Sequence, residues 1–81
     1  MEVRRQASKE LARIGLVDRR RIAQAIDGLA RNPRPTGCRK LNGREGWRIC
    51  VGVYRILYRI EEQRLLVMVV KVGHRKDAYR D

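Results

Sequence analysis

Arginine recurs in segment 47–60 at positions that could together bind a chain of phosphates. Arg48, Arg55 and Arg59 lie among Trp, Ile, Val and Tyr residues, which are residue types that favour β-strands. The guanidinium group is planar and presents its N–H donors as a fork, so it can pair two phosphate oxygens at once. Arginines spaced in this way along neighbouring strands predict a surface that binds a polyanion.

The charge of the whole chain supports the same prediction. Twenty Lys and Arg residues stand against nine Asp and Glu residues in a chain of 81, which gives a formal net charge of +11 at pH 7. The cations are spread along the chain, so the folded body itself must be positive, and such a field concentrates polyanions near the surface. Nucleic acid, above all RNA, is the leading partner, although an acidic protein would satisfy the same field.

Composition also excludes several classes of protein. No apolar run approaches the roughly 20 residues that cross a bilayer, and the first residues resemble no signal peptide, so we expect a cytoplasmic protein without a membrane partner. Cys38 and Cys50 lie in different expected elements without a secretory context, which favours free thiols over a disulfide. His74 is the one histidine, so we expect no metal site and no other cofactor.

Two amphipathic helices are expected in the first part of the chain. The first covers Gln6–Ile14 and should end at Gly15 in a left-handed conformation. The second should begin at an Asp18 N-cap and run to Ala30. Their apolar faces, identified by helical spacing, are formed by Ala7, Leu11 and Ile14 in the first helix and by Ile22, Ile26 and Leu29 in the second.

Strand patterns follow a basic loop over residues 34–46, in which a turn is expected at Asn42-Gly43. The expected strands are Trp47–Val51, Tyr54–Ile60 and Leu65–Val72. Their connections are so short that they must form an antiparallel meander, and Met1–Arg5 has the composition of a short additional strand. We therefore predict one α+β domain over residues 1–81, with two helices on one face of an antiparallel sheet of three to four strands.

Strand alternation assigns side chains to the two faces of this sheet. The apolar positions expected beneath the helices are Trp47, Ile49, Val51, Tyr54, Ile56, Tyr58 and Ile60. Arg48, Arg55 and Arg59 then lie on the uncovered side, and Lys71 and the segment Gly73-His74-Arg75-Lys76 should add cations at its rim. A charged face that is merely solvated is the alternative.

The order of the elements and four short motifs together resemble one known family. The motifs are Lys40-Leu41-Asn42-Gly43, Trp47-Arg48-Ile49, Tyr54-Arg55-Ile56-Leu57-Tyr58 and Val72-Gly73-His74-Arg75-Lys76-Asp77-Ala78-Tyr79. Over nearly the whole chain, they resemble the RelE/ParE superfamily of bacterial and archaeal toxins. The resemblance implies the toxin of a type II toxin-antitoxin module, which a cognate antitoxin protein holds inactive in a hetero-oligomer.

Members of this superfamily differ in their targets. RelE-type toxins are metal-independent endoribonucleases that enter the ribosomal A site, cut the mRNA by attack of the ribose 2′-OH, and so inhibit translation. ParE-type toxins share the fold and inhibit DNA gyrase without cutting RNA. Arg75 and Tyr79, which follow Val72-Gly73-His74, favour a RelE-type mRNA interferase, because ParE-type toxins need no set of residues that clamps a phosphate. A ParE-like inhibitor or a weakly active RNA-binding relative are the alternatives.

The resemblance also implies roles for individual residues. The catalytic set comprises Arg48, Arg55, Arg75 and Tyr79, and the RNA-binding set comprises Lys40, Arg44, Arg59, Lys71, His74 and Lys76. In the catalytic set, Arg55 and Arg75 would clamp the phosphate and stabilise the transition state. Cys50 departs from the pattern, because relatives often carry Lys or Arg at this position, where a lysine can act as a base. This departure keeps the weakly active relative among the alternatives.

Overall fold

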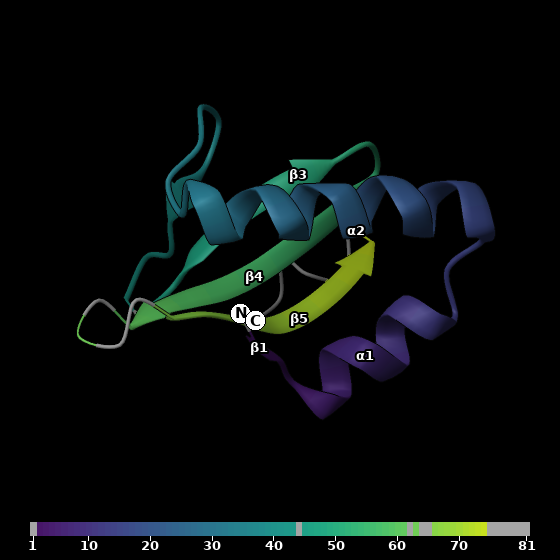
Figure 1. The fold of residues 1–81 in the computed structure, drawn as a ribbon, viewed down its shortest axis with the longest axis horizontal. Coiled ribbons are helices and arrows are strands. Elements are labelled where there is room, and N and C mark those ends of the chain that lie inside the picture. Colours follow the sequence, from purple (N-terminus) through teal and green to yellow (C-terminus); the bar gives the residue numbers. More distant parts are fainter. Residues whose placement is uncertain (1, 44, 62, 64–65, 75–81) are drawn as a thin grey trace.

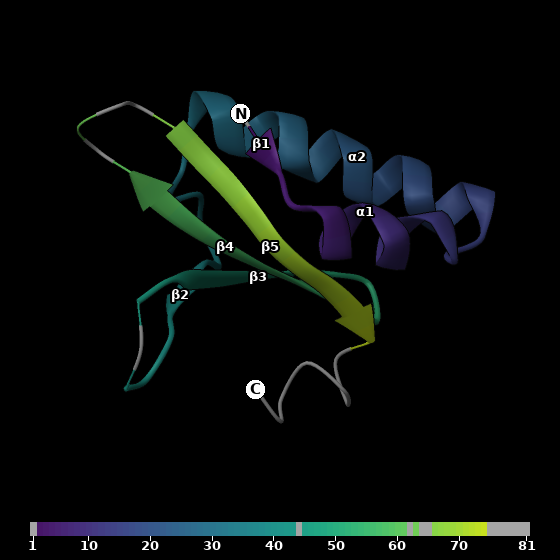
Figure 2. The same ribbon diagram turned by 90° about the horizontal axis from the view of Figure 1, so that it is seen from below.

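The computed structural model describes residues 2–43, 45–61, 63 and 66–74 and shows two layers, one of helices and one of strands (Figure 1). Helices α1 (Arg5–Ala12) and α2 (Leu16–Arg31) lie on one face of a single sheet (Figure 2). The strands of the sheet are β1 (Glu2–Val3), β2 (Arg39–Lys40), β3 (Trp47–Val51), β4 (Tyr54–Glu61) and β5 (Leu66–His74). The predicted α+β fold class is confirmed.

The strand order is β1-β5-β4-β3-β2, and β3, β4 and β5 form the predicted antiparallel meander. Two strands of two residues each extend its edges. Strand β1 pairs parallel to β5, with Val3 opposite Val69, and β2 pairs antiparallel to β3, with Arg39 opposite Arg48. The sheet is therefore mixed and has five strands, where an antiparallel sheet of three to four was expected.

The junction between the helices differs from the expectation. Helix α1 ends at Ala12, and Gly15 has φ −58°, so Gly15 does not take the left-handed conformation. It is instead the N-cap residue of α2, a position that glycine also favours. Asp18 then lies within the first turn of α2, where its negative charge complements the positive end of the helix dipole.

The core lies between the helices and the sheet. The predicted apolar faces of the helices are confirmed, since Ala7, Ile22 and Leu29 are fully buried and Ile14 and Ile26 join them in the same cluster. On the sheet, the helix-facing side chains in this cluster are Ile56, Tyr58, Val67, Val69 and Val72, with Trp47, Ile49, Val51, Tyr54 and Ile60 packed against it. The alternation predicted for β3 and β4 is therefore confirmed on this face.

A β-bulge in β5 changes which of its side chains face the helices. Leu57 lies opposite Lys71 but Tyr58 lies opposite Val69, so Val70 is an additional residue in the ladder. A bulge of this kind re-aims the side chains that follow it. As a result Val72 joins Val69 in the core, and Lys71 turns to the opposite face.

Gly46 fixes the close approach of the loop to the sheet. Its φ is 129°, a conformation that side chains rarely adopt. A Cβ atom at this position would lie 3.0 Å from Leu41 Cδ1 and 3.2 Å from the carbonyl oxygen of Tyr58. The backbone of Leu41 also donates a hydrogen bond of 3.0 Å to the carbonyl of Gly46. These contacts hold Glu45 next to β4.

Candidate nucleic-acid interface

Cations from three neighbouring strands meet on the sheet face that points away from the helices. The strand register sets Arg48, Leu57 and Lys71 in one row across β3, β4 and β5. Adjacent strands lie about 4.8 Å apart, so the row from Arg48 to Lys71 spans about 10 Å. Arg55 lies in the next row, between Cys50 and Gly73. We call the face formed by Arg48, Arg55, Arg59 and Lys71 the arginine face.

The centre of the arginine face is buried rather than open. Arg55 is 6% exposed, and the neighbouring Leu57 and Met68 are 3% and 6% exposed. This corrects the expectation that the whole face is uncovered. Electrostatic attraction is stronger away from water, so a phosphate brought next to Arg55 would interact more strongly with it than with an exposed arginine. Arg48 and Lys71, which are half-buried, flank this central position.

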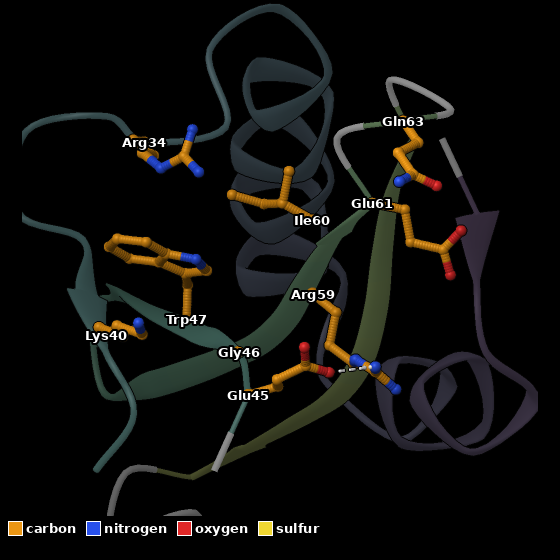
Figure 3. A pocket seen from close by; sticks show the side chains of 9 residues that line it. All are labelled: Arg34, Lys40, Glu45, Gly46, Trp47, Arg59, Ile60, Glu61 and Gln63. Atoms are coloured by element: carbon orange, nitrogen blue, oxygen red, sulfur yellow. Dashed lines mark hydrogen bonds and ion pairs between the residues drawn. The ribbon is translucent and has the colours of Figure 1, made fainter. Parts of the chain in front are cut away.

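Arg59 lies on the same face at the end of β4 that is distant from Arg55. Its Nη2 donates a hydrogen bond of 2.6 Å to Oε2 of Glu45, which Figure 3 shows as a dashed line. The side chains are 45% and 82% exposed. Exposed ion pairs of this kind contribute little to stability, so an incoming anion can compete with Glu45 for Arg59.

Two residues of the predicted RNA-binding set lie away from the arginine face. His74 is paired with Tyr54, and their ring centroids are 6.1 Å apart in an edge arrangement. The bulge in β5 therefore places His74 on the helix-facing side, which corrects its expected position at the rim of the arginine face. Lys40 is opposite Trp47 in the register and also lies on the helix-facing side, at the edge of the sheet.

The remaining predicted residues are Arg44, Arg75, Lys76 and Tyr79, and all four lie outside the described residues. Cys50 is described and exposed, directly opposite Arg55 in the register. Both cysteines are free thiols, as predicted.

Among the described residues, no three His, Cys, Asp or Glu side chains gather as metal ligands would. None of the described helices is both long and apolar enough to span a membrane.

A cavity of about 420 Å³ lies beside Trp47 (Figure 3), and its lining reaches from Trp47 and Ile60 on the helix-facing side to Glu45 and Arg59 on the arginine face. Trp47 packs against the core, as predicted, and the guanidinium of Arg34 lies 5.2 Å from its ring centroid. This distance is typical of a cation–π contact. Lys40 also lines the cavity. Sequence reasoning had placed Arg34 only within a basic loop.

A buried tyrosine positions the loop that carries Arg34. Tyr58 is 1% exposed, and its hydroxyl donates a hydrogen bond of 2.6 Å to the carbonyl oxygen of Pro33. Burial, followed by the nearby Cys38, raises the pKa of Tyr58 well above its usual 10.0, whereas Arg34 acts in the opposite direction. The hydroxyl therefore stays protonated and remains a donor to the loop.

Known proteins resemble this chain in sequence. The family model described as ParE toxin of type II toxin-antitoxin system, parDE, matches residues 1–79. Toxin RelG of Mycobacterium tuberculosis is 48% identical over 29 residues, which are 36% of this chain and 33% of that protein. The short aligned segment covers well under two thirds of that relative.

Solved structures share the fold. The toxin-antitoxin complex RelBE of E. coli contains a chain that matches with a TM-score of 0.79 and 24% identity, over 90% of this chain and 92% of that chain. An archaeal RelE-RelB complex from Pyrococcus horikoshii matches with a TM-score of 0.81 and 24% identity, over 91% of each chain. The family model covers nearly the whole sequence, and the chain therefore belongs to the ParE toxin family of type II toxin-antitoxin systems, within the RelE/ParE superfamily.

Proposed function

We propose that this toxin is a metal-independent endoribonuclease that cuts mRNA in the ribosomal A site and so inhibits translation. The observation that carries the proposal is the convergence of Arg48, Arg55 and Lys71 from three adjacent strands, with Arg55 buried among them. One face thus combines several fixed cations within about 10 Å. Preorganised cations aimed at developing charge are usually the largest contribution to catalysis.

The chemistry assigned to this face is an internal transfer of the phosphodiester. The ribose 2′-oxygen forms a bond to the adjacent phosphorus, the bond to the 5′-oxygen breaks, and a 2′,3′-cyclic phosphate and a 5′-OH result. The 2′-OH loses one proton, and the leaving 5′-oxygen gains one. Arg55 would hold the phosphate oxygens through its fork, while Arg48 and Lys71 would balance the charge that develops on them. Arg75 and Tyr79 keep the catalytic roles that the family resemblance implies.

A ParE-like inhibitor of DNA gyrase is the second candidate. It is favoured by the family model, which is that of the ParE toxins. Such an inhibitor acts by binding and requires no catalytic arrangement around a phosphodiester. The three-strand set of cations favours the ribonuclease, because a binding surface does not need a buried guanidinium at its centre.

One experiment in cells separates the two candidates. The chain is expressed inducibly, the 5′ ends of ribosome-bound messages are mapped, and plasmid supercoiling is measured in the same cells. We expect codon-phased cuts that fall by a factor of about 10² or more with Arg55→Ala and persist with Arg20→Gln. Arg20 is an exposed arginine of α2 and controls for the loss of one charge. Relaxed or broken DNA with intact messages would instead establish the gyrase inhibitor.

The proposed partner is a cognate antitoxin protein that binds the basic body in the cytoplasm. The net charge of +11 favours an acidic partner. The related structures named above are of toxin bound to antitoxin. The ribosome and its mRNA are the proposed target, and no metal or other cofactor takes part.

A further inference from the structure

A second cavity, of about 600 Å³, lies beside the arginine face near the start of α1. Its lining residues are Arg4, Arg5, Gln6, Glu45, Arg59 and Val70. Three arginines and one glutamate give this lining a formal charge of +2. The proposed catalytic set uses none of these six residues, and Arg59 is the member of this lining that the sequence indicated as RNA-binding.

Contacts to β5 fix one side of the cavity. The backbone N–H of Arg4 donates a hydrogen bond of 2.9 Å to the carbonyl of Val69, and its Nε lies 2.9 Å from the sulfur of Met68. Met68 is opposite Arg59 in the register of β4 and β5. Arg4 and Arg59 are therefore brought to the same part of the arginine face, and Met68 lies buried next to both of them.

Glu45 already shows the kind of group that this cavity accepts. Its carboxylate oxygen lies 2.6 Å from Nη2 of Arg59 (Figure 3). A phosphate presents the same type of negatively charged acceptor oxygen as a carboxylate. Arginine can pair with a phosphate through two hydrogen bonds. The side chain of Glu45 is 82% exposed, so it can turn away into solvent when another anion takes its place.

The distance from the proposed cleavage position determines which phosphate could bind here. Arg55 and Arg59 are four residues apart in β4, which corresponds to roughly 13 Å along the strand. Arg55 is a described residue, and it is not one of the residues that line this cavity. An anion in the cavity must therefore be another phosphate of the strand.

We propose that this cavity is a second phosphate-binding subsite, in which Arg4, Arg5 and Arg59 hold a phosphate of the RNA strand whose cleaved phosphodiester lies at Arg55. Glu45 occupies Arg59 in the free protein and is displaced when RNA binds. This inference rests on the proposed ribonuclease function. If the inference is correct, the protein binds RNA over more nucleotides than the two that the cleaved phosphodiester joins.

The test compares short and long RNA analogues that cannot be cleaved. A dinucleotide and an octanucleotide, each with 2′-deoxy substitution, are titrated into the purified chain and followed by fluorescence anisotropy at several salt concentrations. Arg4→Gln/Arg5→Gln should bind the octanucleotide about tenfold more weakly at low salt. The slope of log K against log salt should become shallower by about 0.7 for each phosphate that the variant no longer binds. The dinucleotide should bind as it does to the unaltered chain.

Glu45→Gln should change the affinity for the octanucleotide in the opposite direction. With its competitor for Arg59 neutralised, the octanucleotide should bind about threefold more tightly, as expected for an exposed pair. Arg20→Gln is the control matched in charge to Arg5→Gln, and Arg19→Gln/Arg20→Gln is the control matched to the double variant. Thermal unfolding reports whether each variant is folded. Arg5→Gln alone repeats the test without touching the contact of Arg4 with Met68.

The subsite is refuted if Arg5→Gln and the double variant weaken octanucleotide binding no more than their charge-matched controls in α2 do, with an equal salt slope. Weaker binding of the octanucleotide by Glu45→Gln also refutes it. The same holds if these variants bind RNA normally and bind only an acidic protein more weakly. Failure of the unaltered chain to cut ribosome-bound messages would refute the proposed function instead. In that case binding that depends on RNA length can still be observed.

Discussion

At the level of single residues, the position opposite Arg55 would decide how a proton leaves the attacking hydroxyl in the proposed ribonuclease. Cys50 occupies it, with its thiol exposed on the arginine face. The family resemblance places Lys or Arg there in many relatives, where a lysine can act as the base. A thiol is shorter and reaches less far from the strand than a lysine amine. The chain therefore has the cations of the arginine face without a basic side chain at position 50.

Replacing this thiol tests whether proton removal limits the rate. Cys50→Lys should raise cleavage of ribosome-bound message by about tenfold, a modest part of what a well-placed base can supply. Message ends mapped at fixed times after addition of the toxin to stalled ribosomes measure the effect. Cys50→Ser, which keeps the size and adds no base, is the control and should leave the rate near that of the unaltered chain. An unchanged or lower rate in the lysine variant would count against this interpretation of Cys50.

At the scale of elements, the bulge in β5 shows where sequence reasoning stops. Simple alternation correctly assigned the faces of β3 and β4, because their apolar residues recur with a strict period of two. In β5 apolar residues follow one another without a break from Leu66 to Val70, so no period reveals the additional residue. The bulge places Lys71 on the arginine face and turns His74 toward Tyr54.

The sequence did not predict the edge strands and the helix ends correctly for a different reason. Strands β1 and β2 have two residues each, too few to show an apolar period, and they exist because longer neighbours offer unpaired backbone groups. Gly15 and Asp18 are both common at helix ends, so the composition alone could not decide which one caps α2. The apolar stripe of α2, by contrast, follows a helical period over about two turns and was predicted correctly.

The loop after α2 depends on one hydrogen bond to the sheet. Tyr58→Phe removes the 2.6 Å hydrogen bond to the carbonyl of Pro33 and should destabilise the fold at pH 7 by about 1 kcal/mol. Burial raises the pKa of Tyr58 above 10.0 in the folded state. Its contribution is therefore complete below pH 10.0 and is lost as the pH rises above that value, because the unfolded chain ionises first.

Urea unfolding at pH 7, 10 and 11 measures both effects. Between pH 10 and 11 the unaltered chain should lose up to about 1.4 kcal/mol of unfolding free energy that Tyr58→Phe does not lose. Tyr54→Phe is the matched control, since it removes a phenol from the same strand without the bond to Pro33. Equal alkaline losses in the unaltered chain and in Tyr58→Phe would show that the pKa of Tyr58 is not raised by folding. Equal stability of the two proteins at pH 7 would show that the loop is held by other contacts.

At the scale of the whole molecule, the positive charge was evident from composition, but its arrangement was not. The sequence grouped Arg48, Arg55 and Arg59 because strand alternation places them on one face of the predicted sheet. It missed Arg4 and Arg5, which approach Arg59 only because β1 pairs with β5. It also missed Glu45, whose pairing with Arg59 depends on the backbone at Gly46. Contacts between segments far apart in sequence leave no local pattern that could predict them.

The net charge of +11 should govern how fast an antitoxin finds this protein. Long-range attraction accelerates encounter, and salt screens it over about 10 Å at 0.1 M. We expect the association rate constant to fall at least about tenfold between 20 mM and 500 mM salt, with a smaller change in the dissociation rate constant. Stopped-flow mixing with the purified antitoxin measures the association rate constant, and competitive displacement measures the dissociation rate constant.

Replacing Arg19, Arg20 and Arg31 of α2 by Gln lowers the net charge from +11 to +8. The variant should associate more slowly at 20 mM salt and at nearly the original rate at 500 mM. An association rate that is indifferent to salt in both proteins would mean that local fit, and not the field of the whole molecule, controls the encounter.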